Sequence, residues 1–201
     1  PPVPGGFTAA ASGPTSIAWS WTDGVDEQGY RVKRATDNSI ALSTGPNVAT
    51  WAQTGLSANT SQQMYVEAYN PVGTSSSAAI TRFTQAAVPT GTIIQTISSD
   101  TVTVQWGVNG NRGGTVFEVS RATENGFAVP VLGTTTAVSF EFAGLIPNTS
   151  HYFKARAKND DGLFSVYDSS VSTTTATEIT APAAPTGLTT LPLDGRVNLS
   201  W

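Results

Sequence analysis

The stretch TVTVQW, residues 101–106, decides the fold class of this chain. Its two valines and its tryptophan alternate with polar residues, and this period of two places the three apolar side chains on one face of a β-strand. The same pattern occurs in SIAWSW, residues 16–21, and in RVNLSW, residues 196–201. The chain therefore uses one strand motif three times, which predicts a tandem of related β units.

The amino-acid composition favours strands over helices. Of the 201 residues, 39% are hydrophobic and 12% are charged, and this charged share is about half of the ~25% that is usual in globular proteins. Small, hydroxyl-bearing and β-branched residues fill the difference, and they suit strands and turns. No long stretch has the period of an amphipathic helix. We therefore expect an all-β protein.

Charge and cysteine content exclude several classes of partner. The net charge of −4 argues against nucleic acid, because a nucleic-acid-binding surface needs a basic patch. No apolar run approaches the roughly 18 residues of a membrane-spanning helix. The absence of cysteine excludes disulfides and thiolate metal sites. We expect no nucleic-acid partner and no membrane span within this sequence.

The repeat extends beyond the three tryptophan strands. Several further features recur at one offset of 89 residues, and they relate two complete units, residues 1–84 and 89–180. The matching features are Gly55-Leu56 with Gly144-Leu145, Asn59-Thr60-Ser61 with Asn148-Thr149-Ser150, Asn70 with Asn159, and Gly73 with Gly162. Residues 185–201 repeat only the beginning of a unit, and we expect them to supply the first two strands of a third.

The order of these features resembles the fibronectin type III repeat. A proline precedes the tryptophan strand, and Gly-Leu, a threonine, Ala-x-Asn and a glycine follow it in each complete unit. The resemblance implies an all-β fold of tandem seven-strand Greek-key β-sandwiches, fibronectin type III or immunoglobulin-like, of the bacterial extracellular type. It also implies core positions, which are Trp21, Trp106, Trp201, Leu56 and Leu145.

The chain departs from this family at one position. The family places a tyrosine two residues after the repeat's threonine, and its hydroxyl bonds to upstream backbone to form a tyrosine corner. Here those positions hold Gln62 and His151. We expect both side chains to be largely buried substitutes that bond to the backbone of the preceding turn.

No group of residues converges on catalysis. The chain has a single histidine, His151, and its place in the repeat is structural. The acids at residues 23–27 and at Asp160-Asp161 lie in turns and lack the spacing of an EF-hand loop. The sequons that begin at Asn59, Asn148 and Asn198 are weak evidence for glycans. The sequence predicts no enzyme, no cofactor and no metal site.

A ligand-binding face has weak support. Tyr65 and Tyr69 lie on the outward phase of one strand, and Arg31 and Lys33 lie on the strand expected beside it. A cross-strand ladder of cations and aromatic rings explains these residues as structural, and a carbohydrate- or protein-binding face is the alternative. The basic residues Lys154, Arg156 and Lys158 are interpreted as a solvent-exposed sheet face.

The tandem repeat of β units is the main basis for predicting the function. The favoured hypothesis is a non-catalytic structural spacer array in a longer extracellular or cell-surface protein, within a filament or surface assembly. The alternatives are a carbohydrate- or protein-binding adhesion module and an accessory segment of a secreted polysaccharide-degrading enzyme. The partners expected are neighbouring domains of the same chain. The third unit would be completed by a longer chain or, in the alternative, by self-association with a neighbouring copy.

The linker between the two complete units is short. Residues 85–88 precede Pro89, and a four-residue linker that ends in proline keeps the two units close together. The topology of the fibronectin type III family places the turn between the fifth and sixth strands of the first unit near the loops 107–114 and 160–163 of the second. We expect a small, polar, glycine-rich contact there, without a shared hydrophobic core.

Overall fold

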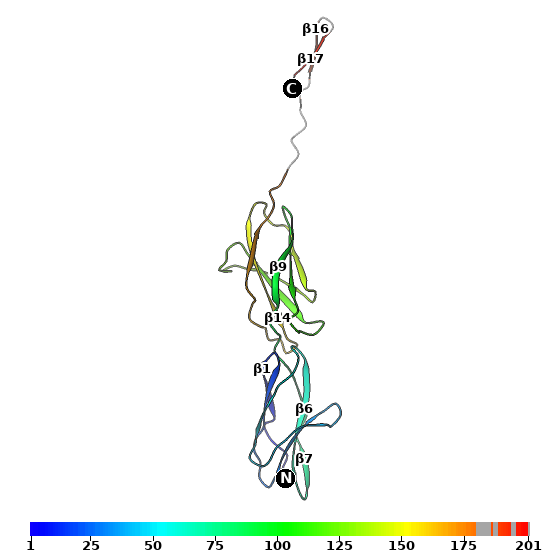
Figure 1. Cartoon of the computed structure of the whole chain (residues 1–201), viewed down its shortest axis with the longest axis vertical. Helices are drawn as coiled ribbons and strands as arrows, with labels where there is room; N and C mark the ends of the chain where they lie inside the picture. The colour runs from blue at the N-terminus through cyan, green and yellow to red at the C-terminus, as the bar shows by residue number, and fades with distance from the viewer. Residues whose placement is uncertain (180–185, 187–188, 194–195, 201) are drawn as a thin grey trace.

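The computed structural model describes residues 1–179, 186, 189–193 and 196–200. The described residues form strands and turns without any helix, which confirms the all-β prediction. Figure 1 shows two β-sandwiches arranged end to end along the long axis of the molecule. The predicted core residue Trp201 lies outside the described residues.

The first sandwich packs a three-stranded sheet against a five-stranded sheet. Strands β1, β2 and β5 form the first sheet, and β4, β3, β6 and β7 follow one another in the second, with β8 also paired to β6. The bounds are β1 (Thr8–Gly13), β2 (Ser16–Ser20), β3 (Gly29–Arg34), β4 (Ile40–Ser43), β5 (Thr50–Gln53), β6 (Ser61–Asn70), β7 (Gly73–Ser76) and β8 (Ile80–Phe83). The last strand of the sandwich is thus divided into two pieces.

The second sandwich has seven strands in the same arrangement. Strands β13, β10 and β9 form one sheet, and β12, β11, β14 and β15 form the other. The bounds are β9 (Thr90–Ile97), β10 (Val102–Gly107), β11 (Val116–Ala122), β12 (Val131–Thr135), β13 (Ser139–Phe142), β14 (Ser150–Lys158) and β15 (Val171–Thr174). These strands and their crossed order match the predicted Greek-key sandwich.

Each sandwich has its own hydrophobic core. The buried core of the first sandwich consists of Ile17, Trp19, Trp21, Tyr30, Val32, Met64, Val66 and Ala68, with Leu56 and Trp51 partly buried against it. That of the second consists of Ala86, Val102, Val104, Trp106, Phe117, Val119, Phe142, Leu145, Phe153, Ala155 and Ala157. The two clusters share no residue, so the described cores are separate.

A further hairpin follows the second sandwich in sequence. Strand β16 (Thr189–Leu193) pairs antiparallel with β17 (Arg196–Ser200). In the first sandwich β1 pairs with β2 in the same antiparallel sense. Among the described residues no helix is long and apolar enough to cross a membrane.

Candidate functional site: the junction between the two sandwiches

The turn at the end of the first sandwich is held by a threonine that directly follows the last strand, β8. The hydroxyl of Thr84 donates to the carbonyl oxygen of Ser57 at 2.7 Å and accepts the N–H of Thr60 at 3.0 Å. Thr84 is fully buried. Because a buried backbone group without a partner is costly, this hydroxyl stabilises the turn by satisfying two of them. We call it the threonine latch.

The second sandwich has the same latch. Thr175 donates to the carbonyl oxygen of Ile146 at 2.7 Å and accepts the N–H of Thr149 at 3.0 Å. Sequence reasoning missed both threonines, because they lie 91 residues apart and therefore break the common offset of the repeat.

The structure corrects the prediction that Gln62 and His151 replace the tyrosine of the tyrosine corner by bonding to the preceding turn. His151 is buried, but its Nδ1 lies 3.2 Å from Nη1 of Arg121, and its Nε2 has no hydrogen-bond partner among the described residues. Gln62 is only half-buried; it donates to the carbonyl oxygen of Ser61 and accepts from the Gln53 side chain. Neither side chain bonds to the backbone of the turn at 57–60 or 146–149, where the threonine latch supplies the hydrogen bonds instead.

Asn59 occupies the centre of the junction. It has φ of 49°, a left-handed conformation that asparagine tolerates better than most residues. Its Nδ2 donates to Oγ1 of Thr115 at 2.9 Å and to Oδ1 of Asp160 at 3.1 Å, and its Oδ1 accepts the N–H of Asp160 at 2.9 Å. The side chain is fully buried. One residue of the first sandwich therefore bonds to two loops of the second.

A second asparagine makes the reciprocal contact. Asn159, which directly follows β14, donates from Nδ2 to the carbonyl oxygen of Thr84 at 3.0 Å. Its Oδ1 accepts the N–H of Leu163 at 2.8 Å and so fixes the turn that carries Asp160. Asn159 is 3% exposed. The latch residue of the first sandwich is thereby tied to the second.

A third asparagine holds the linker. The Asn111 side chain accepts the N–H of Ala87 and donates to the carbonyl oxygen of the same residue, both at 2.8 Å. It also donates to the carbonyl oxygen of Val108, and its backbone forms a parallel bridge with Ala58. Both the N–H and the carbonyl oxygen of Ala87 in the linker therefore bond to the second sandwich.

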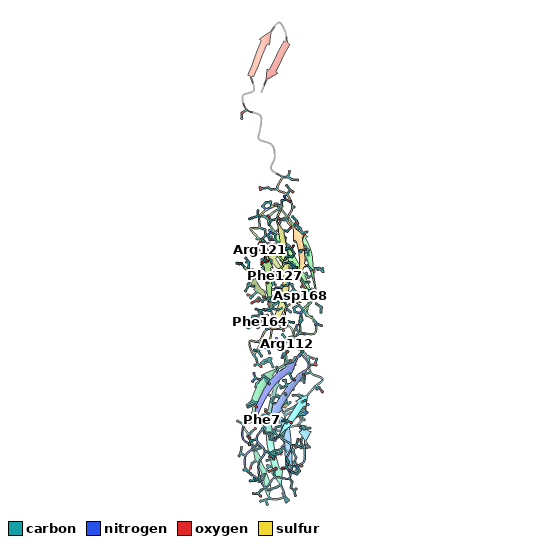
Figure 2. All side chains as sticks on the ribbon, turned by 90° about the vertical axis from the view of Figure 1, so that its left-hand side faces the viewer. Phe7, Arg112, Arg121, Phe127, Phe164 and Asp168 are labelled. Carbon is teal, nitrogen blue, oxygen red and sulfur yellow. The ribbon has the colours of Figure 1, made fainter. Side chains whose placement is uncertain are left out.

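The rim of the junction carries charged groups. Asp161 accepts from Arg82 at 3.3 Å and from the N–H of Phe83 at 3.0 Å. Arg112 pairs with Asp160 and lies over the ring of Phe83, and Figure 2 shows it where the two sandwiches meet. Because these ion pairs are partly exposed, each contributes little on its own. The expected contact between the turn at 57–60 and the two loops is confirmed, and the participation of Arg82 and Phe83 is new.

The predicted ligand face of the first sandwich, which consists of Arg31, Lys33, Tyr65 and Tyr69, also contains an acid that the sequence analysis did not identify. Glu67 of β6 accepts from Arg31 at 3.1 Å and from Lys33 at 2.8 Å. Burial would raise the pKa of Glu67, but the hydrogen bonds from the two cations outweigh it and lower that pKa. The Arg31 guanidinium lies 4.2 Å from the ring centre of Tyr69. Tyr65 donates to the Asn38 side chain.

The corresponding face of the second sandwich is a longer ladder of rings and cations. Lys154 lies 3.8 Å from the ring centre of Phe127 and 4.5 Å from that of Tyr167. Arg156 lies 4.5 Å from Tyr167 and 3.9 Å from Phe164. Figure 2 shows Phe127 and Phe164 at successive levels along the sandwich. The basic residues of β14 are thus half-buried between rings, which corrects their interpretation as a solvent-exposed face.

A buried acid anchors the centre of this ladder. Glu118 accepts from Arg156 at 2.7 Å and from the hydroxyl of Tyr167 at 2.6 Å. Burial and the hydrogen bond to Glu118 raise the pKa of Tyr167 to about 12. At the same strand position the first sandwich has the opposite arrangement, with the cation at Arg31 and the acid at Glu67.

A hollow of about 490 Å³ lies beside the linker. Pro89, Thr92, Asn109, Tyr167 and Asp168 are among its lining residues. Burial raises the pKa of Asp168 despite its hydrogen bonds. One carboxylate oxygen accepts the N–H of Ala155 at 2.7 Å and the other accepts the hydroxyl of Thr92. Both oxygens therefore have structural partners.

The acidic turns show no metal-binding arrangement. In the part of the chain that the structure describes, no three histidine or acidic side chains gather to hold a metal ion. Asp23 instead accepts from the hydroxyl of Tyr30 at 3.0 Å, and Asp160 and Asp161 bond across the junction.

Comparisons with known proteins give relatives and a shared fold. No protein-family model matches the chain. It is 30% identical to exoglucanase B of Cellulomonas fimi over 224 residues, which cover all of this chain and 19% of that protein. It is 30% identical to chitinase A1 of Niallia circulans over 197 residues, which cover 90% of this chain and 27% of that protein. The chain therefore spans less than a third of either relative.

The structure is similar to a segment of two fibronectin type III domains from chicken tenascin. The TM-score is 0.61 at 16% identity, and the match covers 86% of this chain and 99% of that one. At this level of identity the similarity establishes a common fold.

Proposed function

Both sandwiches have the fibronectin type III fold, and we propose that this tandem is a stiff, non-catalytic spacer in a longer extracellular chain that acts on polysaccharide. Its domains would be residues 1–84 and 89–180, with residues 185–201 beginning a third. The names of the relatives support the setting, since both are glycan-degrading enzymes of which the chain matches a minor part. The spacer would hold other modules of such a chain at a fixed distance.

The observation that carries this proposal is the hydrogen bonding of Asn59. A short linker limits separation but leaves rotation free, whereas a buried side chain bonded to two loops restricts rotation as well. Each of these bonds contributes roughly 0.5–1.5 kcal/mol when its groups would otherwise meet water. Asn159 and Asn111 add bonds at separate points of the same contact. Three such points define an orientation.

Spin-label distances test the stiffness of the junction. Because the chain has no cysteine, cysteines introduced at the exposed positions Thr36 and Thr123 would carry the only labels. We expect a single narrow distance distribution across the junction. Asn59→Gly keeps the left-handed backbone but removes the amide, so we expect the distribution to broaden.

Asn148→Gly is the matched control. Asn148 has φ of 52° at the same repeat position but is exposed, so its substitution should leave the distance distribution between the first two sandwiches unchanged. A broad distribution in the unsubstituted chain would contradict the stiff spacer.

A further inference from the structure

The end of the second sandwich repeats the surface on which the first sandwich receives its neighbour. At the first junction, the N–H of Asn59 donates to the carbonyl oxygen of Gln85 and the N–H of Thr84 to that of Thr60. At the second end, Asn148 donates to Ala176 and Thr175 to Thr149 in the same way. We call this end of the second sandwich, where Asn148 is exposed and the latch residue Thr175 is buried, the C-terminal socket.

The central residue of the socket is in the conformation of its bound counterpart. Asn148 has φ of 52° and Asn59 has φ of 49°. The Asn148 side chain is exposed and makes no hydrogen bond to any residue that the structure describes, whereas the amide of Asn59 is fully bonded. The socket therefore presents, on a backbone of the same conformation, an amide whose equivalent binds another sandwich.

We propose that the C-terminal socket docks the N-terminal end of a following sandwich, with Asn148 in the role of Asn59. This inference rests on the proposed spacer function and extends it from one junction to the next. The hairpin formed by β16 and β17 continues the chain with the antiparallel pairing of β1 and β2. The occupant would be the sandwich that this hairpin begins.

The socket also defines the chemistry of its occupant. In the first junction the partner supplies the Thr115 hydroxyl and the backbone N–H and carboxylate of Asp160. The following sandwich should therefore carry a hydroxyl before its third strand and an Asn-Asp turn after its sixth.

A second copy of this chain does not have that chemistry at its free end. In the first sandwich the positions of Asp160 and Asp161 hold Pro71 and Val72. Asn70, the equivalent of Asn159, donates within its own sandwich to the carbonyl oxygen of Asp26. The N-terminal end of the first sandwich thus lacks the acids and the available amide, and end-to-end association of identical chains is disfavoured.

A three-sandwich chain tests the socket. Residues 1–185 would be followed by a second copy of residues 90–179, which keeps the natural linker and carries Thr115, Asn159 and Asp160 at the N-terminal end of the added sandwich. This linker is longer than the first, since nine residues separate Thr175 from Pro185 and four separate Thr84 from Pro89. Its own core and seven strands make the added unit complete. Cysteines at Thr123 of the second sandwich and at the equivalent residue of the third would report the second joint.

We expect a narrow distance distribution at the second joint that is lost in Asn148→Gly. Asn59→Gly serves as the matched variant, because it should broaden only the first joint, measured separately with the Thr36 and Thr123 labels. A broad second joint in the unsubstituted chain, or a narrow one that survives Asn148→Gly, would overturn the socket. Stiffness of the first joint would be unaffected by either result, so failure of the spacer and failure of the socket are distinguishable.

Discussion

His151 and Gln62 occupy the same position of the repeat, but only the histidine changes charge near neutral pH. Burial and the nearby Arg121 lower the pKa of His151 below its ordinary value of 6.5. The unfolded chain therefore takes up the proton first as the pH falls. The free energy of unfolding of the second sandwich should therefore be at its maximum above about pH 6.5 and should decrease as the pH falls toward 5.

The variant His151→Gln gives the second sandwich the glutamine that the first sandwich has at Gln62, and it removes the only histidine that could take up a proton. We expect the decrease in stability toward pH 5 that comes from the histidine to be absent in this variant, whereas the raised pKa of Asp168 contributes alike to the pH dependence of both proteins. Denaturant unfolding at several pH values, followed through amide signals of the second sandwich, measures the difference. Because His151 is the only histidine, an equal pH dependence in both proteins would show that the buried ring is not responsible.

At the scale of the element, the threonine latch joins the last strand of each sandwich to the turn before its longest strand. Thr175→Val keeps the shape of the side chain but leaves the carbonyl oxygen of Ile146 and the N–H of Thr149 without their partner. We expect the second sandwich to lose about 1–3 kcal/mol of unfolding free energy, the usual cost of an unpaired buried polar group.

Thr84→Val is the repeat-matched variant and should destabilise the first sandwich by a similar amount. Chemical denaturation resolved by sandwich checks both. If neither variant differed from the unsubstituted chain, water or backbone movement would be replacing the hydroxyl, and the latch would not be a stabilising element.

The regular strands could be predicted from alternation, but the irregular edges could not. The period of two in TVTVQW is reproduced by burial of Val102, Val104 and Trp106 and by partial exposure of the residues between them. Phe164 and Tyr167, in contrast, come from a segment without alternation that bonds back to β14 through the backbone of Ser165 and Asp168. Periodicity reports which side of a strand is covered, but it does not report which loop covers it.

At the scale of the whole molecule, the sequence predicted where the sandwiches meet but not which residue joins them. The short linker and the expected topology indicated the correct loops. Asn59 was interpreted only as a turn residue and a sequon, because its partners Thr115 and Asp160 are distant in sequence. A polar contact of this kind has no periodic signature, since it depends on single side chains rather than on a face.

The separate cores make a prediction about how the whole chain unfolds. Trp21 and Trp106 each lie in one core, and neither indole N–H has a partner in the described structure, so replacement by alanine removes packing without breaking a hydrogen bond. We expect Trp106→Ala to lower the unfolding free energy of the second sandwich by about 3–5 kcal/mol. The first sandwich should keep its stability, because the junction contributes hydrogen bonds and exposed ion pairs rather than a shared core. Trp21→Ala should destabilise the first sandwich and leave the stability of the second unchanged.

Amide hydrogen exchange, measured separately for the two sandwiches, distinguishes these outcomes. Simultaneous loss of protection in both sandwiches of either variant would mean that the polar junction makes the tandem a single cooperative unit.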